Sequence, residues 1–346
     1  MSATPQNRRA DMRVLITGAT GFVGAWTAKA VHDRGHRLRL LVRDPARLSS
    51  IAAAMDFDGA DVVRGDMTDP ERVREALDGC DAVVHTAAVV ALDTRAAVHM
   101  DRANLAGAQN VLGQAVARGM DPIVYVSSVT ALWHRQCPLL HADLPPGGGG
   151  DAYGRSKARI EQYARELQQR GAPVVVTYPS SVLGPAAGEQ FGESGEAIAT
   201  FTRSGVPGRG AAITIGDVRD LAEAHSRLLE PGRGPRRYVL GGHRITGGEL
   251  AAHLTQITGR TVRHYPIPDG LLVGAAKLAD RFRDRLPPSL NKFGEAGVRY
   301  LIDAPPADNS PAERDLGITF RPVRQTLEDL LADRRRIRRA RTANPA

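Results

Sequence analysis

Tyr153 and Lys157 are the residues whose types and spacing first suggest chemistry in this chain. They lie four positions apart in a segment, 152–170, whose pattern predicts a helix, so both side chains would share one helix face. A tyrosine hydroxyl has an ordinary pKa of about 10, which is too high for ready proton exchange at neutral pH. An ammonium group one turn away favours the phenolate and lowers that pKa. The pair could therefore protonate a carbonyl or deprotonate an alcohol.

The rarity of lysine in this sequence gives Lys157 extra weight. The chain has 46 lysines and arginines together, and only four of them are lysines. There are also only seven tyrosines among the 346 residues. A tyrosine and a lysine at this spacing would seldom arise by chance.

Two serines follow a predicted strand upstream of this pair. Residues 123–126 form a short apolar run, and Ser127 and Ser128 come directly after it. The carboxyl ends of parallel strands border the ligand cleft, so a serine there could hold a substrate oxygen beside the tyrosine. Side chains alternate along a strand, which means that only one of the two hydroxyls can face the cleft. The alternation leaves open which one it is.

A glycine-rich turn follows the first predicted strand, residues 12–16, and opens a predicted helix over 22–34. The first glycine permits a tight turn, the second lets backbone amides approach a pyrophosphate, and the third lets the helix pack close to the sheet. The helix would point its N-terminal amides at the anion. We expect a dinucleotide to be held by this segment, at Gly18, Thr20, Gly21, Phe22, Val23 and Gly24.

The residue after the second predicted strand, 38–42, distinguishes NADP from NAD. An NAD site uses a carboxylate there to bind the ribose 2′-hydroxyl. This chain has Arg43 at that place and Arg47 one helical turn later. A guanidinium suits a 2′-phosphate, so NADP(H) is favoured over NAD(H). Asp44 could serve NAD instead if the strand ended one residue later.

Two further segments fit a dinucleotide cleft because they follow strands 61–63 and 82–84. Asp66, which precedes Met67, could accept a hydrogen bond from the adenine amino group or could act as a turn or cap residue. Ala87 and Ala88 are small enough to let the backbone lie against the cofactor. His85 is interpreted as a structural histidine rather than a catalyst.

The elements that must position these residues alternate along the first half of the chain. Predicted helices lie between the strands, near 70–78, 96–118 and 152–170, and this alternation predicts a parallel sheet with helices on both faces. The further strands, 174–176, 212–215 and 237–240, flank another predicted helix over 218–229. We expect both of the last two strands to join the main sheet.

The fold class expected is α/β, a Rossmann-type doubly wound parallel sheet with a smaller, mostly helical C-terminal substrate region. The nucleotide-binding core would span 12–180 plus parts of 213–242. Residues 181–212 and 243–330 would form the substrate-binding region. Within the first of these, 184–212 is rich in Gly and Pro and is interpreted as mostly loop. The ends, 1–11 and 331–346, are expected to be basic and flexible.

Charge and composition exclude several classes of protein. The net charge of +8 is carried by the two ends, so nucleic acid is not expected as a partner despite the arginine-rich tail. No apolar run reaches the roughly 18 residues of a membrane-spanning helix. Two cysteines are too few for a disulfide framework, and the N-terminus does not resemble a signal peptide, so a cytoplasmic location is expected. No metal site is expected.

Several motifs together make the chain similar to the extended short-chain dehydrogenases/reductases, the NAD-dependent epimerase/dehydratase superfamily. The resemblance covers about 12–245, and within the superfamily it is strongest to the branch of dihydroflavonol reductases, cinnamoyl-CoA reductases and 3β-hydroxysteroid dehydrogenases. The segments that carry it are 17–24, 65–67, 85–88, 125–128, Tyr153 with Lys157, 178–185, and Asn104 within 104–110.

The resemblance implies roles for particular residues. It selects Ser128 as the catalytic serine beside Tyr153, and it implies that Lys157 bonds the ribose of the nicotinamide. The backbone after Pro179, including Val182, would line the nicotinamide pocket. Asn104 would support the catalytic site.

The function predicted is an NADP(H)-dependent oxidoreductase that reduces a carbonyl, or oxidises a secondary alcohol, of a mostly apolar small molecule. One alternative is a nucleotide-sugar epimerase or dehydratase with tightly bound NAD. Another is a non-catalytic NADP-sensing regulator, although such relatives typically lose the tyrosine or the lysine. The helices near 96–118 and 152–170 could also pair two chains in a homodimer.

Overall fold

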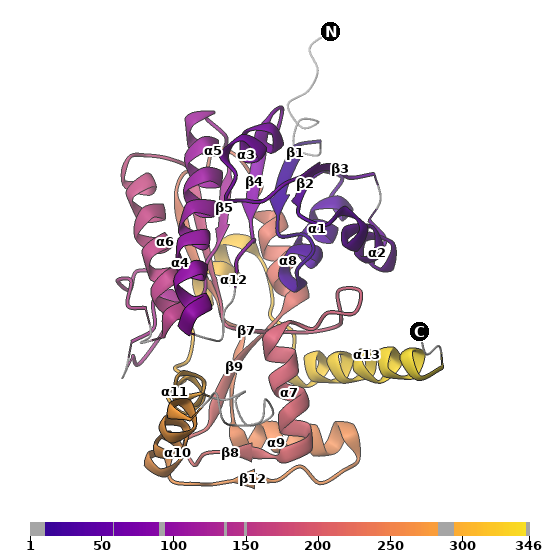
Figure 1. Ribbon diagram of the computed structural model, residues 1–346, viewed down its shortest axis with the longest axis vertical. Coiled ribbons are helices and arrows are strands. Elements are labelled where there is room, and N and C mark those ends of the chain that lie inside the picture. The colour runs from indigo at the N-terminus through magenta and orange to yellow at the C-terminus, as the bar shows by residue number, and fades with distance from the viewer. Residues whose placement is uncertain are drawn as a thin grey trace.

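The computed structural model describes residues 11–57, 59–89, 94–134, 137–148, 151–282 and 294–343. A seven-stranded sheet, with every neighbouring pair parallel, forms its centre (Figure 1). Because β1 is flanked by β2 on one side and β4 on the other, the winding direction reverses there, which is where ligands bind in such sheets. In spatial order the strands are β10 (Arg236–Leu240), β6 (Val174–Pro179), β5 (Ile123–Val126), β4 (Ala82–His85), β1 (Arg13–Thr17), β2 (Arg37–Val42) and β3 (Asp61–Arg64).

Helices cover both faces of this sheet, which confirms the predicted doubly wound α/β class. Val14 and Ile16 of β1 enter one apolar core and Leu15 enters the other. Strands buried on both faces are therefore apolar without alternation, as the sequence indicated. One face carries α1 (Phe22–Asp33), α2 (Pro45–Met55) and α8 (Val218–Arg227). The other carries α3 (Pro70–Leu77), α6 (Ala152–Gln169) and α4 (Thr94–Ala108), which continues through a π-helical stretch (Gln109–Gly113) into α5 (Gln114–Ala117).

One expected strand of the main sheet lies elsewhere, which corrects the sequence prediction. β10 does join the sheet, beside β6. β9 (Ala212–Asp217) instead forms the centre of a second sheet, antiparallel to β11 (His243–Thr246) and parallel to β7 (Ser181–Leu183). A third pair joins β8 (Val206–Pro207) to β12 (His264–Tyr265). A short apolar run has the same pattern in either sheet, so only tertiary pairing decides its place.

The C-terminal half is mostly helical, as predicted, with two differences. The Gly-rich 184–212 segment contains a helix, α7 (Gly192–Ser204), rather than loop alone. α12 (Ser310–Leu316) lies against the core of the main sheet, not with the substrate region, because Ala312 and Leu316 pack among residues of α8 and β10. The other helices are α9 (Gly247–Thr258), α10 (Asp269–Arg281), α11 (Glu295–Ile302) and α13 (Val323–Ala343).

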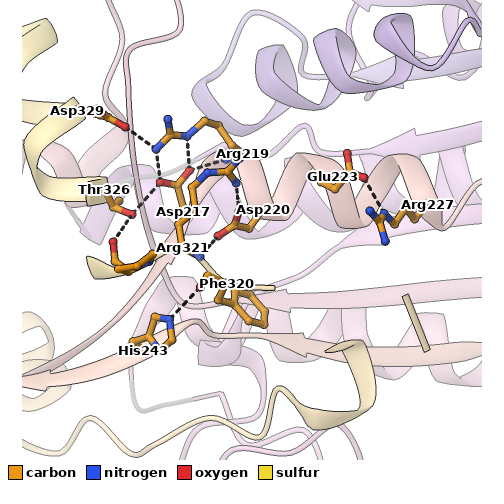
Figure 2. A network of polar contacts seen from close by, with 11 residues as sticks. Asp217, Arg219, Asp220, Glu223, Arg227, His243, Phe320, Arg321, Thr326 and Asp329 are labelled. Carbon is orange, nitrogen blue, oxygen red and sulfur yellow. Dashed lines mark hydrogen bonds and ion pairs between the residues drawn. The ribbon is translucent and has the colours of Figure 1, made fainter. Parts of the chain in front are cut away.

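A network of ion pairs ties the N-terminus of α8 to the chain that leads into α13 (Figure 2). Asp217 is fully buried and accepts hydrogen bonds from the guanidinium of Arg219, at 2.9 and 2.7 Å, and from the hydroxyl of Thr326 at 2.8 Å. Asp220 accepts from the backbone amide of Arg321 at 2.7 Å and from its guanidinium. These contacts give Arg219 and Asp220 structural roles.

The basic C-terminal end is helical where a flexible tail was expected. Residues 331–343 belong to α13, which runs outward from the body (Figure 1). Arg334 forms two hydrogen bonds with Glu196 of α7, at 2.7 and 3.0 Å, and its guanidinium lies 4.7 Å from the ring centre of Phe191. The sequence could not show these partners because they lie more than a hundred residues away. Residues 1–10 and 344–346 lie outside the described residues.

No helix among the described residues combines the length and apolar character needed to cross a bilayer.

Candidate active site

A cleft of about 440 Å³ opens where β1, β2, β3 and β4 end. It is bordered by the turns that follow these strands and, from the other side, by residues near β7 and the first turn of α7. Of the residues predicted to hold a cofactor, those that line it are Gly18, Thr20, Gly21, Phe22, Val23, Gly24, Arg43, Arg47, Asp66, Met67, Ala87, Ala88 and Val182, whereas Tyr153, Lys157 and Pro179 are not among its lining residues.

The glycine turn forms a cradle that side chains would fill. Gly18 has a φ of +81°, and a Cβ on it would lie 2.7 Å from the amide nitrogen of Ala87. A Cβ on Gly24 would lie 2.2 Å from the carbonyl oxygen of Gly18. Gly21 caps α1 without a side-chain hydrogen bond, so the first amides of the helix are left for a ligand. The described residues thus fit the pyrophosphate of a dinucleotide.

The end of β2 presents a cation to the cleft. The Arg43 side chain is 76% exposed, and its guanidinium lies 3.8 Å from a carboxylate oxygen of Asp66. The neighbouring Asp44 instead caps α2 by accepting a hydrogen bond from the amide of Arg47 at 3.1 Å. The other carboxylate oxygen of Asp66 accepts from the amide and the hydroxyl of Thr68, which is the turn role considered from the sequence.

Tyr153 and Lys157 lie on one face of α6, as their spacing predicted. The ammonium nitrogen of Lys157 lies 5.9 Å from the centre of the Tyr153 ring. It donates a hydrogen bond to the carbonyl oxygen of Val126, at the end of β5, at 3.1 Å. Only 3% of Lys157 is exposed, and burial lowers its pKa to about 8.

The pKa of Tyr153 is shifted in the direction opposite to the sequence prediction. Burial raises it above the ordinary value, and the nearby carboxylates of Glu193 and Asp151 add to the rise. The nearby hydroxyl of Ser128 lowers it, but by less. The loss of hydration disfavours the phenolate more than the charge of Lys157 favours it. The hydroxyl therefore stays protonated and can act as a proton donor.

Of the two serines, the structure brings Ser128 to the tyrosine. The hydroxyl oxygen of Ser128 accepts hydrogen bonds from the amide of Thr130 at 3.2 Å and from its hydroxyl at 2.9 Å. Its own proton is therefore available to Tyr153 or to a substrate oxygen. Ser127 is buried with its hydroxyl beside Tyr125 instead. Side-chain alternation along the strand left open which serine faces the tyrosine of α6, and in the structure this serine is Ser128.

The remaining predicted residues support the site from its edges. Asn104 binds both backbone groups of Val89, at 2.7 and 2.9 Å, and so holds the loop after β4. His85 bonds the hydroxyl of Thr17 at 2.7 Å, and burial lowers its pKa to about 3, which keeps it neutral. Pro179 ends β6 directly before Ser180, which lines the cleft.

Several residues of the site were missed by sequence reasoning. Glu193, in the first turn of α7, lines the cleft and acts on Tyr153. Tyr300 of α11 is close enough to Ser181 and Tyr153 to interact with both, and its ring packs edge-on against Trp133 at 6.3 Å between ring centres. No spacing in the sequence links these residues, because they come from four separate segments.

Comparison with known proteins identifies relatives over most of the chain. The profile described as the NAD dependent epimerase/dehydratase family matches residues 14–241. The "Sterol demethylase protein B" of Methylococcus capsulatus is 29% identical over 93% of this chain and 98% of its own length. A putative dihydroflavonol 4-reductase of Synechocystis sp. is 29% identical over 91% of this chain and 92% of its own. A 4-hydroxy-2-methyl-3-oxo-4-farnesyl-3,4-dihydroquinoline-1-oxide ketoreductase of Stigmatella aurantiaca is 30% identical over 92% of this chain and 96% of its own length.

Solved structures share the fold. A UDP-glucose-4-epimerase from Stenotrophomonas maltophila, with bound NAD and formylated UDP-arabinopyranose, superposes with a TM-score of 0.76. That comparison covers 95% of this chain and 99% of the epimerase at 21% identity, and at this identity it bears on the fold alone. The structure of gox2253 superposes with a TM-score of 0.75 at 29% identity, and the comparison covers 93% of this chain and 98% of gox2253.

Proposed function

Because the chain belongs to the NAD-dependent epimerase/dehydratase family, we propose that it is an NADP(H)-dependent oxidoreductase that reduces a carbonyl of a mostly apolar small molecule, or oxidises the matching secondary alcohol. The observation that carries this proposal is the meeting of Tyr153, Lys157 and Ser128 at the carboxyl end of β5, with Glu193, which lines the cleft, close enough to act on Tyr153. The relatives include reductases that match nearly the whole chain.

The three side chains would divide the proton chemistry among them. Tyr153 would donate its hydroxyl proton to the developing alkoxide, or would take that proton in the reverse direction. Ser128, oriented by Thr130, would bind the same substrate oxygen. Lys157 would place a positive charge one turn from Tyr153 and stabilise the phenolate left after transfer. A bound nicotinamide supplies or accepts the hydride.

The preference for NADP(H) rests on the end of β2. Arg43 and Arg47 both line the cleft and could bind a 2′-phosphate. Asp44 is engaged as the cap of α2, which leaves it poorly placed to accept a ribose hydroxyl. Within the described part of the chain, the Arg43 guanidinium meets one carboxylate, that of Asp66 at 3.8 Å, so a phosphate could readily become its main partner.

An apolar substrate is supported by the aromatic side chains around Tyr153. Trp133 packs edge-on against Tyr300, and Tyr300 is close enough to Tyr153 to act on it. The names of two relatives contain a sterol and a farnesylated quinoline, both of them largely hydrocarbon. We propose that residues 181–212 and the helices within 243–302 form the substrate-binding region over the core.

The first experiment tests turnover and binding separately. The purified chain is mixed with NADPH and a panel of steroid and prenylated ketones, and oxidation of the cofactor is followed by its absorbance. Tyr153→Phe should still bind NADPH with little change while turnover falls by about two orders of magnitude or more. Retained turnover in that variant would refute the assignment of the acid.

The same panel separates the alternative functions. Conversion of a sugar nucleotide without net consumption of cofactor would indicate an epimerase. Binding of NADPH that changes affinity for a protein, with no turnover of any ketone, would indicate a sensing protein.

A further inference from the structure

Four side chains that can carry or transfer charge follow one another on α6 at intervals of four residues: Tyr153, Lys157, Glu161 and Arg165. Residues at this interval occupy successive turns of one helix face. The proposed function uses only the first two. The third, Glu161, is 0% exposed, although carboxylates are seldom fully buried without a specific partner.

One oxygen of Glu161 is anchored from two directions. Its Oε1 accepts a hydrogen bond from the hydroxyl of Tyr178, on β6, at 2.5 Å. The same atom accepts from Nε of Arg165 at 2.7 Å, and the Arg165 guanidinium also reaches the carbonyl oxygen of Leu144 at 2.8 Å. These bonds hold the carboxylate in place.

The second oxygen of Glu161, Oε2, is buried and has no hydrogen-bond partner among the described residues. A buried charged oxygen left in this state is costly unless a nearby opposite charge compensates it. Lys157 lies one turn earlier on the same helix face and is itself almost fully buried. Arg165 pairs with the carboxylate through Oε1, and Lys157 is a second cation whose charge the same carboxylate can offset.

The other titratable groups that face Lys157 are uncharged near neutral pH. Tyr153 lies on the same helix as Lys157, and His85 lies on β4. Tyr125 lies on β5, with its ring centre 5.3 Å from the ammonium nitrogen of Lys157. Burial raises the pKa of both tyrosines and lowers that of His85 to about 3. Burial also lowers the pKa of Lys157, and the Glu161 carboxylate is the charge that opposes this fall.

We propose that Glu161 is a positioning residue of the active site, whose anchored carboxylate keeps Lys157 charged beside Tyr153. Its catalytic consequence rests on the proposed function, because the charge of Lys157 matters for proton transfer at Tyr153. Without this carboxylate, Lys157 and Arg165 would be two buried or half-buried cations on one helix face with no counter-ion between them. Lys157 would then lose its proton at or below neutral pH.

The small number of lysines makes a direct test practical. Carbon-13 labelling of lysine in the full chain gives four side-chain signals, and the one lost in Lys157→Arg is that of Lys157. In the wild type this signal should titrate with a midpoint of about 8. In Glu161→Gln, which keeps the shape of the side chain, the midpoint should fall by about one pH unit or more.

Two further variants distinguish charge from packing. Glu166→Gln, on the exposed face of the same helix, is the matched control and should leave the Lys157 midpoint unchanged. Glu161→Asp keeps the charge and should restore most of the midpoint. If the proposed function is also correct, the pH profile of turnover in Glu161→Gln shifts to lower pH together with the lysine signal.

A folded Glu161→Gln protein whose Lys157 midpoint equals that of the wild type overturns the proposal. If this variant does not fold, the reciprocal experiment uses Lys157→Met with carbon-13-labelled glutamate. One glutamate should then titrate at a higher pH than in the wild type, by about half a unit or more, and identical curves for all glutamates overturn the proposal. Neither titration needs nicotinamide or substrate, so a chain that reduces no ketone refutes the proposed function without affecting this result.

Discussion

Replacing Arg43 should weaken NADPH much more than NADH, if Arg43 binds the 2′-phosphate. A hydrogen bond to a charged group contributes about 1.5–3 kcal/mol to binding. The Arg43 side chain is 76% exposed, and Asp66 competes for it at 3.8 Å, so the lower end of that range applies. About 1.5 kcal/mol corresponds to a roughly tenfold rise in the KM for NADPH in Arg43→Ala.

The assay compares kcat/KM for NADPH and NADH with one fixed ketone, together with the direct affinity for NADP from tryptophan fluorescence. Arg64→Ala, which removes an exposed arginine from the end of the neighbouring strand outside the cleft, is the matched control. Raising the salt concentration should weaken NADPH binding in the wild type more than in Arg43→Ala, since the phosphate contact is exposed.

Equal losses for both cofactors would show that Arg43 supports the cleft as a whole and does not recognise a phosphate. An unchanged KM for NADPH in Arg43→Ala would assign the phosphate to another group, and Arg47 would be the next to test. In either case the proposed preference for NADP(H) would fail, while the roles proposed for the tyrosine and the lysine would stand.

Three further predictions concern the cradle, acid stability and the C-terminal network. Gly24→Ala should abolish measurable dinucleotide binding and destabilise the fold by about 1–3 kcal/mol, because its Cβ would lie 2.2 Å from a carbonyl oxygen; isothermal titration that showed normal affinity would contradict this. His85 and His225 are buried and their pKa values are lowered to about 3, so the stability they confer is present above pH 6.5 and falls by about 1.4 kcal/mol per histidine for each unit below it. Urea unfolding at pH 7.5 and 5.5 tests this, and equal stability would count against it. Arg321→Ala leaves the buried Asp220 with only a backbone donor and should cost about 2 kcal/mol in the free energy of unfolding, with Arg314→Ala on the exposed surface as the control.

The nucleotide half of the molecule could be predicted because its signals are local. The strand, the glycine turn and the helix that follow one another over 13–33 are adjacent in sequence, and the steric reasons given for Gly18 and Gly24 hold in the structure. The alternation of strands and helices likewise predicts a parallel sheet without any knowledge of distant contacts.

Predictions failed where two segments have similar sequence patterns but different tertiary contacts. β9 has an apolar run like those of the main sheet, yet pairs with β11. The Gly content of 184–212 suggested loop, although Gly192 and Gly205 lie at the ends of α7, with φ of +64° and +81°, and so mark where that helix begins and stops. In the arginine-rich end, Arg334 pairs with Glu196 of α7, and no residue near Arg334 in the sequence predicts this contact.

For this protein, the sequence alone determined the parallel core, the cradle for a dinucleotide and the placing of Tyr153 and Lys157 on one helix face. Each of these depends on residues within a few turns of one another. Only the tertiary structure decided that Tyr300 joins the site from the far end of the chain and that the pKa of Tyr153 is raised. Burial and long-range contact set these features, and neither quantity is carried by the spacing of residues along the chain.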